Sequence, residues 1–373
     1  MKRGWCPNLY DPMPAGDGLL VRVKPRGARI TAVALRLLAH PAARLGNGAV
    51  ELTRRANFQV RGLSHAGAEE FATAMVAAGL ASADPGAERR RNVLTAPLAG
   101  DDPSCANDAS VLASALETML EADAWLPAPA AKFAIAVDGG GVLPLVVDAD
   151  IHVRSDGARH WIRAGDACVS CEPDATVAVV RQLVHDAGGR RMRAAFPIAA
   201  ASPPAGFLPY PNTERGAFAI GLPFGQTDAT TLGLLADISE QFGDGTLRTS
   251  PWRALLLGSI RAVDAAAIST AAAGLVVTTD DRRLRMAACI GSAGCASGTV
   301  PARADAAALA DAGWTGFLHL SGCSKGCAHS GAAEVTLVGR DGRYDLVRDG
   351  RADARPAATG LSLAQVRAWL GTA

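Results

Sequence analysis

The chain has 373 residues, which at about 150 residues per domain predicts two to three domains. Hydrophobic residues make up 49% of it and aromatic residues only 5%, so a disordered chain is excluded and an aliphatic core is expected. Lys and Arg number 37 against 36 Asp and Glu, and the net charge of +1 excludes a global field that attracts nucleic acid or an anionic membrane. We therefore expect a small-molecule partner, with any anion bound by a local cluster of basic side chains.

The sequence offers no membrane span and no export signal. The longest apolar run, residues 265–277, is interrupted by Ser and Thr and is shorter than the roughly 18 residues that a span requires. The first residues contain no apolar segment of the kind found in signal peptides. We expect a cytoplasmic protein, in which the eight cysteines are metal ligands rather than disulfides.

Two parts of the sequence resemble each other at a constant offset of 197 residues. Residues 18–27 and 217–225 each predict a short strand that ends in a Pro-containing turn, and a helical pattern follows in both copies. The same offset places Gly46-Asn47-Gly48 on Gly243-Asp244-Gly245. The runs after these turns are predicted strands, at 49–52 and 246–249. We interpret the similarity as a duplication.

The other predicted elements mix helices and strands without strict alternation, which favours an α+β fold over a doubly wound sheet. Helices are expected at 64–80, 109–125, 176–187, 263–273 and 362–370. Strands are expected at 133–137, 148–153, 317–320 and 334–338. Linkers are expected near 84–88 and over 199–212, where prolines and small residues gather.

Four cysteines form two close pairs near the end of the chain. Five residues separate Cys289 from Cys295, and three separate Cys323 from Cys327. Zinc sites favour gaps of two to four residues within a pair, so the wider gap argues against a zinc knuckle. The glycine-bearing loop of the first pair can fold around a bulky inorganic core and donate N–H groups to its sulfurs. The pattern predicts that these four cysteines ligate one 4Fe-4S cluster.

The remaining cysteines carry weaker signals. Cys168 and Cys171 have two-residue spacing but no second pair of that type, so a core or surface role is expected for them. Cys6 and Cys105 belong to no motif.

The cysteine pattern resembles that of the sirohaem-dependent sulfite and nitrite reductases and their relatives. Residues 53–62 resemble the family's arginine segment, and Arg91-Asn92-Val93 resembles its Arg-Asn-Val turn. Residues 126–133 resemble its Leu-Pro-x-Lys-Phe strand, although four residues separate Pro127 from Lys132 here. The resemblance implies duplicated ferredoxin-like half-domains that pair around a pseudo-twofold, flanked by two α/β lobes. The implied half-repeats are 1–66 and 205–262, and the implied lobes are 67–204 and, with the cluster, 263–373.

The resemblance also implies a tetrapyrrole partner, whose acetate and propionate arms make it a polyanion. Arg55, Arg91 and Lys132 are expected to bind it from one cleft that also approaches Cys327, since Arg presents a planar fork that suits carboxylates. The role of Arg61 stays open. The residue aligned with Arg55 in the second repeat is Trp252, so we expect only one half to supply the active face.

The departures from the reductases refine the expected activity. Where they carry a second lysine, two places after the one that matches Lys132, this chain has Ala134. Segments 321–329, 337–344 and 3–19 are most similar to an oxygen-dependent branch of the family that acts in aerobic cobalamin (vitamin B12) biosynthesis. In that branch the tetrapyrrole, precorrin-3A, is the substrate, and dioxygen hydroxylates it at a methylated meso carbon while an acetate arm closes a lactone.

That branch is credited with a 4Fe-4S cluster and a mononuclear non-haem iron, with NADH as the formal reductant. None of the seven histidines begins a His-x-Asp/Glu pair, so the sequence does not locate the second iron. His329 is the candidate nearest the cluster, followed by His152, although ordinary structural roles are expected for both. No G-x-G-x-x-G motif is present, and Gly139-Gly140-Gly141 is interpreted as a turn, so a separate reductase is expected to supply electrons.

Two alternative functions remain open from the sequence. One is a sulfite or nitrite reductase with bound sirohaem, against which Ala134 and the short chain argue. The other is a non-catalytic 4Fe-4S electron-transfer protein, against which the arginine segments argue, because such a protein needs no polyanion site.

Overall fold

The computed structural model describes residues 7–126, 130, 132–192 and 203–372. The chain forms two compact units, one of residues 1–13 and 19–277, the other of residues 14–18 and 278–373. None of the described helices combines the length and apolarity needed to cross a membrane. The division into four domains expected from the sequence stays a prediction.

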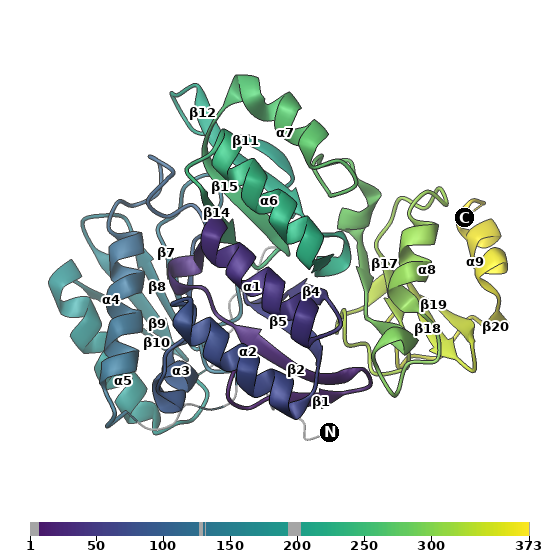
Figure 1. Cartoon of the computed structure of the whole chain (residues 1–373), viewed down its shortest axis with the longest axis horizontal. Helices are drawn as coiled ribbons and strands as arrows, with labels where there is room; N and C mark the ends of the chain where they lie inside the picture. Colours follow the sequence, from purple (N-terminus) through teal and green to yellow (C-terminus); the bar gives the residue numbers. More distant parts are fainter. Residues whose placement is uncertain (1–6, 127–129, 131, 193–202, 373) are drawn as a thin grey trace. The chain divides into compact units, whose positions relative to one another are not determined.

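The first unit contains two copies of one strand–strand–helix–strand–strand motif (Figure 1). The first copy is β2 (Gly18–Val23), β3 (Arg29–Thr31), α1 (Ala32–Leu45), β4 (Ala49–Leu52) and β5 (Phe58–Leu63). The second is β12 (Arg215–Gly221), β13 (Gln226–Asp228), α6 (Ala229–Phe242), β14 (Thr246–Thr249) and β15 (Ala254–Arg261). Five pairs of positions 197 residues apart share a left-handed backbone: Gly27 and Phe224, Ala28 and Gly225, Gly48 and Gly245, Ala56 and Arg253, Gly62 and Ser259. The predicted duplication is confirmed.

The two half-domains exchange their shortest strands. One sheet has the order β1-β2-β5-β4-β13, with β1 covering Met13–Ala15, and the other has the order β11-β12-β15-β14-β3, with β11 covering Gly206–Pro209. Each sheet therefore takes its last strand from the other half. Helices α1 and α6 pack side by side, and Arg36 of α1 pairs with Asp237 and Glu240 of α6 at 2.5 and 2.6 Å (Figure 1). This exchange joins the halves into one body.

Side-chain alternation explains why each half-domain sheet has one apolar face. Val21, Val23, Phe58 and Val60 are fully buried in the core that includes residues of α1, α6 and α2 (His65–Ala77). Successive residues of a strand point to opposite faces, so the residues between them lie on the face away from the helices.

A lobe of the first unit carries a sheet with the order β10-β9-β8-β7-β6. Its strands are β6 (Val93–Thr95), β7 (Ile135–Asp138), β8 (Ile151–Ser155), β9 (His160–Ala164) and β10 (Ala167–Cys171). Its helices are α3 (Pro85–Arg90), α4 (Ala109–Ala122) and α5 (Thr176–Ala187), and α7 (Ala265–Ala271) follows the second half-domain. The structure therefore has helices at the predicted positions 109–125, 176–187 and 263–273.

Both predicted linkers contain regular structure. Pro85 and Gly86, read as loop residues, instead start α3, because Asp84 caps the helix by accepting a hydrogen bond from the Gly86 N–H at 2.7 Å. The described part of the second linker contains β11, which pairs with β12. Residues 199–202 of that prediction and Cys6 lie outside the described residues.

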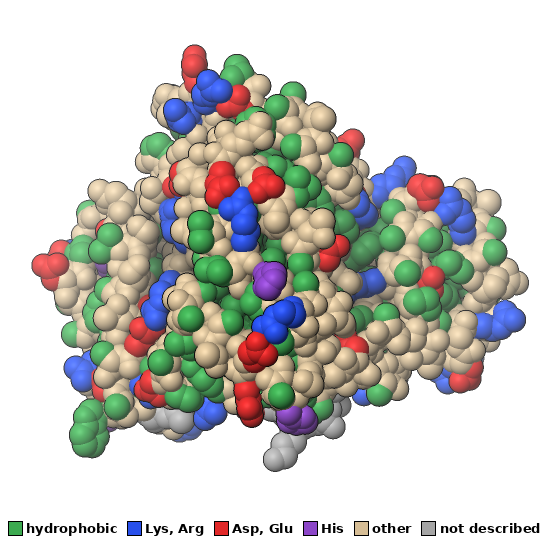
Figure 2. Space-filling model, in the orientation of Figure 1, with side chains coloured by type: hydrophobic (Ala, Val, Ile, Leu, Met, Phe, Trp, Pro, Cys, Tyr) green, Lys and Arg blue, Asp and Glu red, His purple; other side chains and the backbone are tan. Residues whose placement is uncertain are grey.

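The second unit is built on a mixed sheet with the order β16-β17-β18-β19-β20. Its strands are β16 (Met286–Ala288), β17 (Leu318–Ser321), β18 (Ala333–Arg340), β19 (Arg343–Gly350) and β20 (Ala358–Leu361), and its helices are α8 (Ala302–Leu309) and α9 (Leu363–Leu370). Strands β16, β17 and β18 are parallel neighbours, whereas the last two pairings are antiparallel. Figure 2 shows acidic and basic side chains interspersed on the visible surfaces, in keeping with the balanced composition.

Candidate functional site

The two cysteine pairs follow neighbouring parallel strands of the second unit. Cys289 comes directly after β16, and Cys323 comes two residues after the end of β17. Because the strands are parallel, their carboxyl ends meet at one edge of the sheet, and the two cysteine-bearing loops start side by side. The backbone N–H of Gly322 donates a hydrogen bond to the Cys289 sulfur at 3.1 Å, which ties the second loop to the first.

The charges of the other three predicted ligands act on the Cys327 thiol. Burial raises the pKa of the Cys327 thiol, and the negative charges of Cys289, Cys323 and Cys295 raise this pKa further. The Lys325 ammonium lowers it, and its Nζ also donates to the Ser297 hydroxyl at 2.8 Å across the two loops. Cys327 thus lies near enough to the other three cysteines for their charges to influence its pKa. Their role as ligands stays a prediction.

Close backbone packing shapes the cradle around these thiols. A Cβ atom at Gly298 would lie 2.4 Å from the carbonyl carbon of Gly291, and one at Gly322 would lie 2.8 Å from the Gly291 Cα. The second of these positions is also only 3.4 Å from the Cys289 sulfur. Four thiolates in a glycine-lined cradle with an N–H group aimed at one sulfur fit a bulky iron–sulfur cluster. Such a cluster supplies electron transfer when it is bound.

A side chain added at one of these glycines is expected to destabilise the loops that carry the cysteines. Gly298→Ala forces a methyl group against Gly291 and should lower the free energy of unfolding of the second unit by about 1–3 kcal/mol, the usual cost of overpacking. We expect less iron per chain and a lower melting temperature. Gly233→Ala is the matched control, because it lies in α6 with open space at its Cβ position. Equal iron content in both variants would contradict the claim that close packing at Gly298 shapes the cysteine site.

A row of polar residues crosses the first half-domain sheet on the face away from the helices. In neighbouring strands, Arg22 faces Gln59, Gln59 faces Glu51, and Glu51 faces Gln226. The Arg22 Nε donates to Gln59 at 2.9 Å, and Gln59 donates in turn to the Glu51 carboxylate. Arg61 lies on the same face, 3.7 Å from Glu51. We call Arg22, Gln59, Glu51 and Gln226 the polar row.

The sequence interpretation missed Arg22 and Glu51. Their signal is the period of two: Arg22 lies between the buried Val21 and Val23, and Glu51 between the buried Val50 and Leu52. A polar residue that alternates with buried valines in a strand must point to the opposite face of the sheet. Arg22 and Glu51 thus extend the predicted cationic segment into a continuous row of polar side chains, of which Glu51 and Gln59 are buried.

Two of the three predicted pocket cations lie together. Arg55 is half-buried in the turn between β4 and β5, and its guanidinium donates to the backbone oxygen of Lys132. Lys132 is exposed and has a left-handed backbone. Their predicted contact with a ligand, and the approach of that ligand to Cys327, stay predictions.

Arg91 was expected to reach a ligand, but its side chain is buried and paired within the protein. Its side chain is 1% exposed and is paired with Glu88 at 2.9 Å and Glu121 at 3.2 Å. It also donates to the Lys24 backbone oxygen at 2.8 Å. Desolvation lowers the pKa of the Lys24 ammonium to about 8, although Glu88 opposes this shift. Arg91 therefore belongs to a buried charge network, in which its donors are already used by the protein.

The second half-domain presents a different face. At the place of the polar row it has Ala219, Leu256 and Arg248 in register. Leu256 packs in an apolar cluster with Leu98 and Tyr210, and Trp252, the counterpart of Arg55, packs against that cluster. Arg248 is fully buried between two carboxylates, Asp101 at 2.6 Å and Asp244 at 2.7 Å. The two faces thus differ, and the expectation that only one half supplies the active face stays a prediction.

Ala134 occupies a position that has no room for a lysine aimed at a ligand. It is fully buried, and its N–H donates to the Asp150 carboxylate at 3.1 Å. Among the described residues, no three His, Cys, Asp or Glu side chains converge closely enough to hold a single metal ion. The ligands of a mononuclear iron are therefore not assigned, and the His329 Nε2–H donates to the Ala332 backbone oxygen at 3.1 Å.

Comparison with known proteins agrees with the duplicated architecture. The family described as "Nitrite/Sulfite reductase ferredoxin-like half domain" matches twice, over residues 11–78 and 211–274. The structure of the Mycobacterium tuberculosis NirA protein is similar with a TM-score of 0.64 at 16% identity, covering 95% of this chain and 79% of that one. The fold is therefore the α+β fold of the sulfite and nitrite reductases, with two ferredoxin-like half-domains.

A second protein is more similar in sequence, and it identifies the family within this fold. Precorrin-3B synthase from Sinorhizobium sp is 33% identical over 399 aligned positions, which cover 96% of this chain and 85% of that protein. The chain belongs to the precorrin-3B synthase family.

Proposed function

We propose that this chain is a precorrin-3B synthase, a monooxygenase of aerobic cobalamin biosynthesis. The observation that carries the proposal is the likeness to the Sinorhizobium precorrin-3B synthase over nearly the whole chain. In the proposed reaction, one atom of dioxygen enters precorrin-3A as a hydroxyl group at a meso carbon, and an acetate arm forms a lactone. The other oxygen atom leaves as water, with two electrons that derive from NADH.

The four thiols support the proposed cofactor. Cys289, Cys295, Cys323 and Cys327 would hold a 4Fe-4S cluster, since their charges act on one thiol and glycines let the two cysteine-bearing loops pack closely together. The electrons would come from a separate reductase. A mononuclear non-haem iron belongs to the proposal, but without assigned ligands.

The first half-domain offers the chemistry that a polycarboxylate requires. Arg22 is a half-buried cation of the polar row, and Arg55 lies beside the backbone of Lys132, whereas Arg61 is buried and paired with Glu51. Arginine forks bind carboxylate arms bidentately and orient the ring by its edges. The buried Ala134 removes the second lysine that oxyanion reduction would use as a cation and proton donor. We infer that the tetrapyrrole is the substrate and not a bound sirohaem.

Arg55→Ala is expected to weaken substrate binding. It removes a charge-assisted contact, at a cost of roughly 1.5–3 kcal/mol when the partner is a carboxylate. Precorrin-3A affinity should fall by about one to two orders of magnitude, while the cluster absorption stays unchanged. Arg44→Ala is the matched control, because Arg44 is an exposed arginine of α1 that pairs with Glu70 on the surface. A bleached cluster with unchanged precorrin affinity would show that Arg55 has another role.

Purified protein tests the proposal through its absorption spectrum and its substrate range. An anaerobic preparation should show the broad visible absorption of an iron–sulfur cluster without the intense Soret and red bands of sirohaem. With reduced dye as electron source, sulfite and nitrite should give no turnover. Sirohaem bands together with reduction of either oxyanion at ordinary enzymatic rates would overturn the proposal in favour of a reductase.

A further inference from the structure

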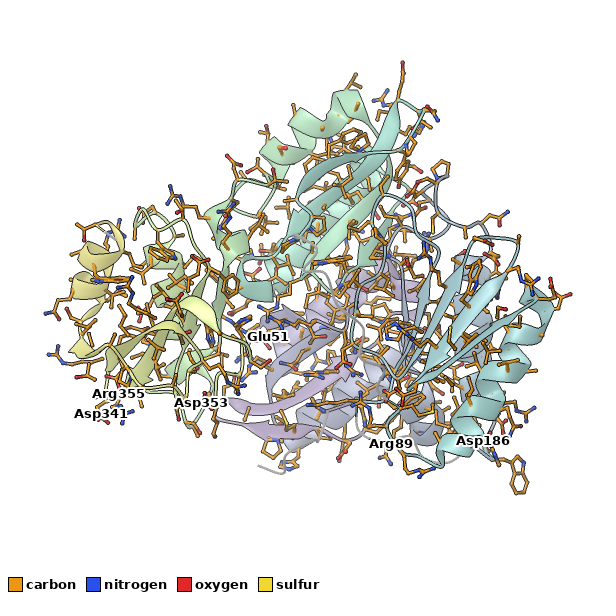
Figure 3. All side chains as sticks on the ribbon, turned by 180° about the vertical axis from the view of Figure 1, so that it is seen from behind. Glu51, Arg89, Asp186, Asp341, Asp353 and Arg355 are labelled. Atoms are coloured by element: carbon orange, nitrogen blue, oxygen red, sulfur yellow. The ribbon has the colours of Figure 1, made fainter. Side chains whose placement is uncertain are left out.

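A buried tyrosine lies in the hairpin that β18 and β19 form in the second unit. Tyr344 of β19 is 2% exposed, and Figure 3 labels Asp341 in the turn that joins the two strands. The Tyr344 hydroxyl donates a hydrogen bond to the Asp305 carboxylate of α8 at 2.5 Å. Residues 337–344 belong to the segments on which the sequence resemblance rests, yet the proposed reaction gives Tyr344 no role. The pair of Tyr344 and Asp305 therefore needs an explanation of its own.

Strand register directs the Tyr344 side chain toward the cysteine-bearing loops. Tyr344 faces Gly339 across the antiparallel pair, and residues directly opposite each other project to the same face of a sheet. A Cβ atom at Gly339 would lie 2.8 Å from the Gly322 carbonyl oxygen and 2.4 Å from the Val300 side chain. The N–H of Gly322 donates in turn to the Cys289 sulfur. Tyr344 therefore lies on the face of the sheet that these loops cover.

Helix α8 brings Asp305 to the same face. The helix starts at Ala302, shortly after the loop that carries Cys295, and Asp305 lies in its first turn. The start of the helix packs tightly on that loop, because a Cβ atom at Gly291 would lie 2.5 Å from the Ala302 nitrogen. The carboxylate is thus carried by an element fixed to one cysteine-bearing loop, and Tyr344 holds it from the neighbouring hairpin.

The charge of Cys289 links this pair to the predicted cluster ligands. Burial raises the pKa of the Tyr344 hydroxyl, and the hydrogen bond to Asp305, the Asp305 charge and the Cys289 charge raise this pKa further. Tyr344 is therefore the protonated partner at neutral pH and donates to the carboxylate. The Cys289 charge acts on the same hydroxyl to which Asp305 is hydrogen-bonded. The carboxylate thus lies within electrostatic range of a group that Cys289 binds.

We propose that the Asp305 carboxylate, held in place by Tyr344, lowers the reduction potential of the cluster that the four cysteines ligate. Reduction adds one negative charge to such a cluster, and a nearby carboxylate repels that charge. A lower potential makes the reduced cluster a stronger electron donor. This inference rests on the proposed function, and it names Asp305 as a residue that tunes the electron supply and Tyr344 as its positioning residue.

An anaerobic redox titration of the reconstituted chain, followed by the electron paramagnetic resonance of the reduced cluster, tests this inference. Asp305→Asn removes the charge and keeps an acceptor for Tyr344. At a fixed solution potential, the ratio of reduced to oxidised cluster should rise about tenfold, the effect of one unit charge over roughly 10 Å in a protein. That ratio corresponds to about 59 mV for a one-electron couple. Tyr344→Phe retains the carboxylate, so its ratio should not rise. Asp311→Asn is the control that should leave the ratio unchanged, because the Asp311 side chain is 78% exposed and water screens its charge.

The outcomes separate this inference from the function beneath it. An unchanged ratio in Asp305→Asn at full iron content would overturn the role of Asp305 and leave the proposed cluster intact. Equal rises in Asp305→Asn and Tyr344→Phe would also overturn it, since they indicate entry of water instead of a lost charge. Asp305→Ser removes the same charge with a smaller side chain and carries the same expectation should Asp305→Asn not fold. A wild-type chain without an iron–sulfur signal would overturn the proposed cofactor and this inference together.

Discussion

Cys323→Ala is expected to abolish the cluster and all turnover. The thiol of Cys323 lies in the loop after β17 and interacts electrostatically with Cys327, so its loss removes one of four ligands from a preformed cradle. Iron content and the broad visible absorption should fall to background after anaerobic reconstitution. Both quantities are measured on the same sample by colorimetric iron analysis and absorption spectroscopy.

Cys168→Ala provides the matched control, because Cys168 is an exposed cysteine of β10 without a partner pair in the sequence motif. Its iron content and spectrum should equal those of the wild-type chain. Retention of a full cluster by Cys323→Ala, or its loss in Cys168→Ala, would contradict the assignment of the ligands.

Arg91→Met is expected to reduce the free energy of unfolding by about 3–5 kcal/mol. The substitution leaves Glu88, whose side chain is 1% exposed, as a buried carboxylate without its closest guanidinium partner. Chemical denaturation followed by circular dichroism measures the change. Arg89→Met is the control, because Arg89 is an exposed residue of the same helix, labelled in Figure 3, and its loss should change stability little.

The same variant decides between two roles of Arg91. Unchanged stability together with a large loss of tetrapyrrole affinity would restore the ligand-binding role that the sequence motif suggested. The buried network predicts the reverse, a destabilised chain whose folded fraction binds normally.

Local sequence patterns predicted several helices and strands well because their signals are short-range. The helix at 176–187 and the strands at 49–52 and 246–249 have the predicted bounds, since periodicity and turn residues define them. Strand β10 was missed, because it is a largely exposed edge strand without buried alternation. The cap at Asp84 turned a predicted linker into a helix.

The candidate site was predictable from the sequence only where the spacing of residues along the chain indicates their chemical role. The cysteine pairs have a diagnostic pattern, and the parallel pairing of β16 with β17 explains why the two pairs meet. Arg91 matched a motif, but its burial depends on Glu88 and Glu121, and no spacing reveals that pairing. Glu51 and Arg22 come together through strand register between segments far apart in the chain. The register between strands far apart in the chain cannot be predicted from a single sequence.

The central claim, that this chain oxygenates a tetrapyrrole, is tested most directly by isotope labelling. Precorrin-3A is incubated with the reconstituted chain, a reductant and ¹⁸O-labelled dioxygen, and the product is analysed by mass spectrometry. The account predicts a hydroxylated lactone that carries one labelled oxygen atom in its new hydroxyl group. An unlabelled tetrapyrrole recovered from a preparation with a full cluster would contradict it.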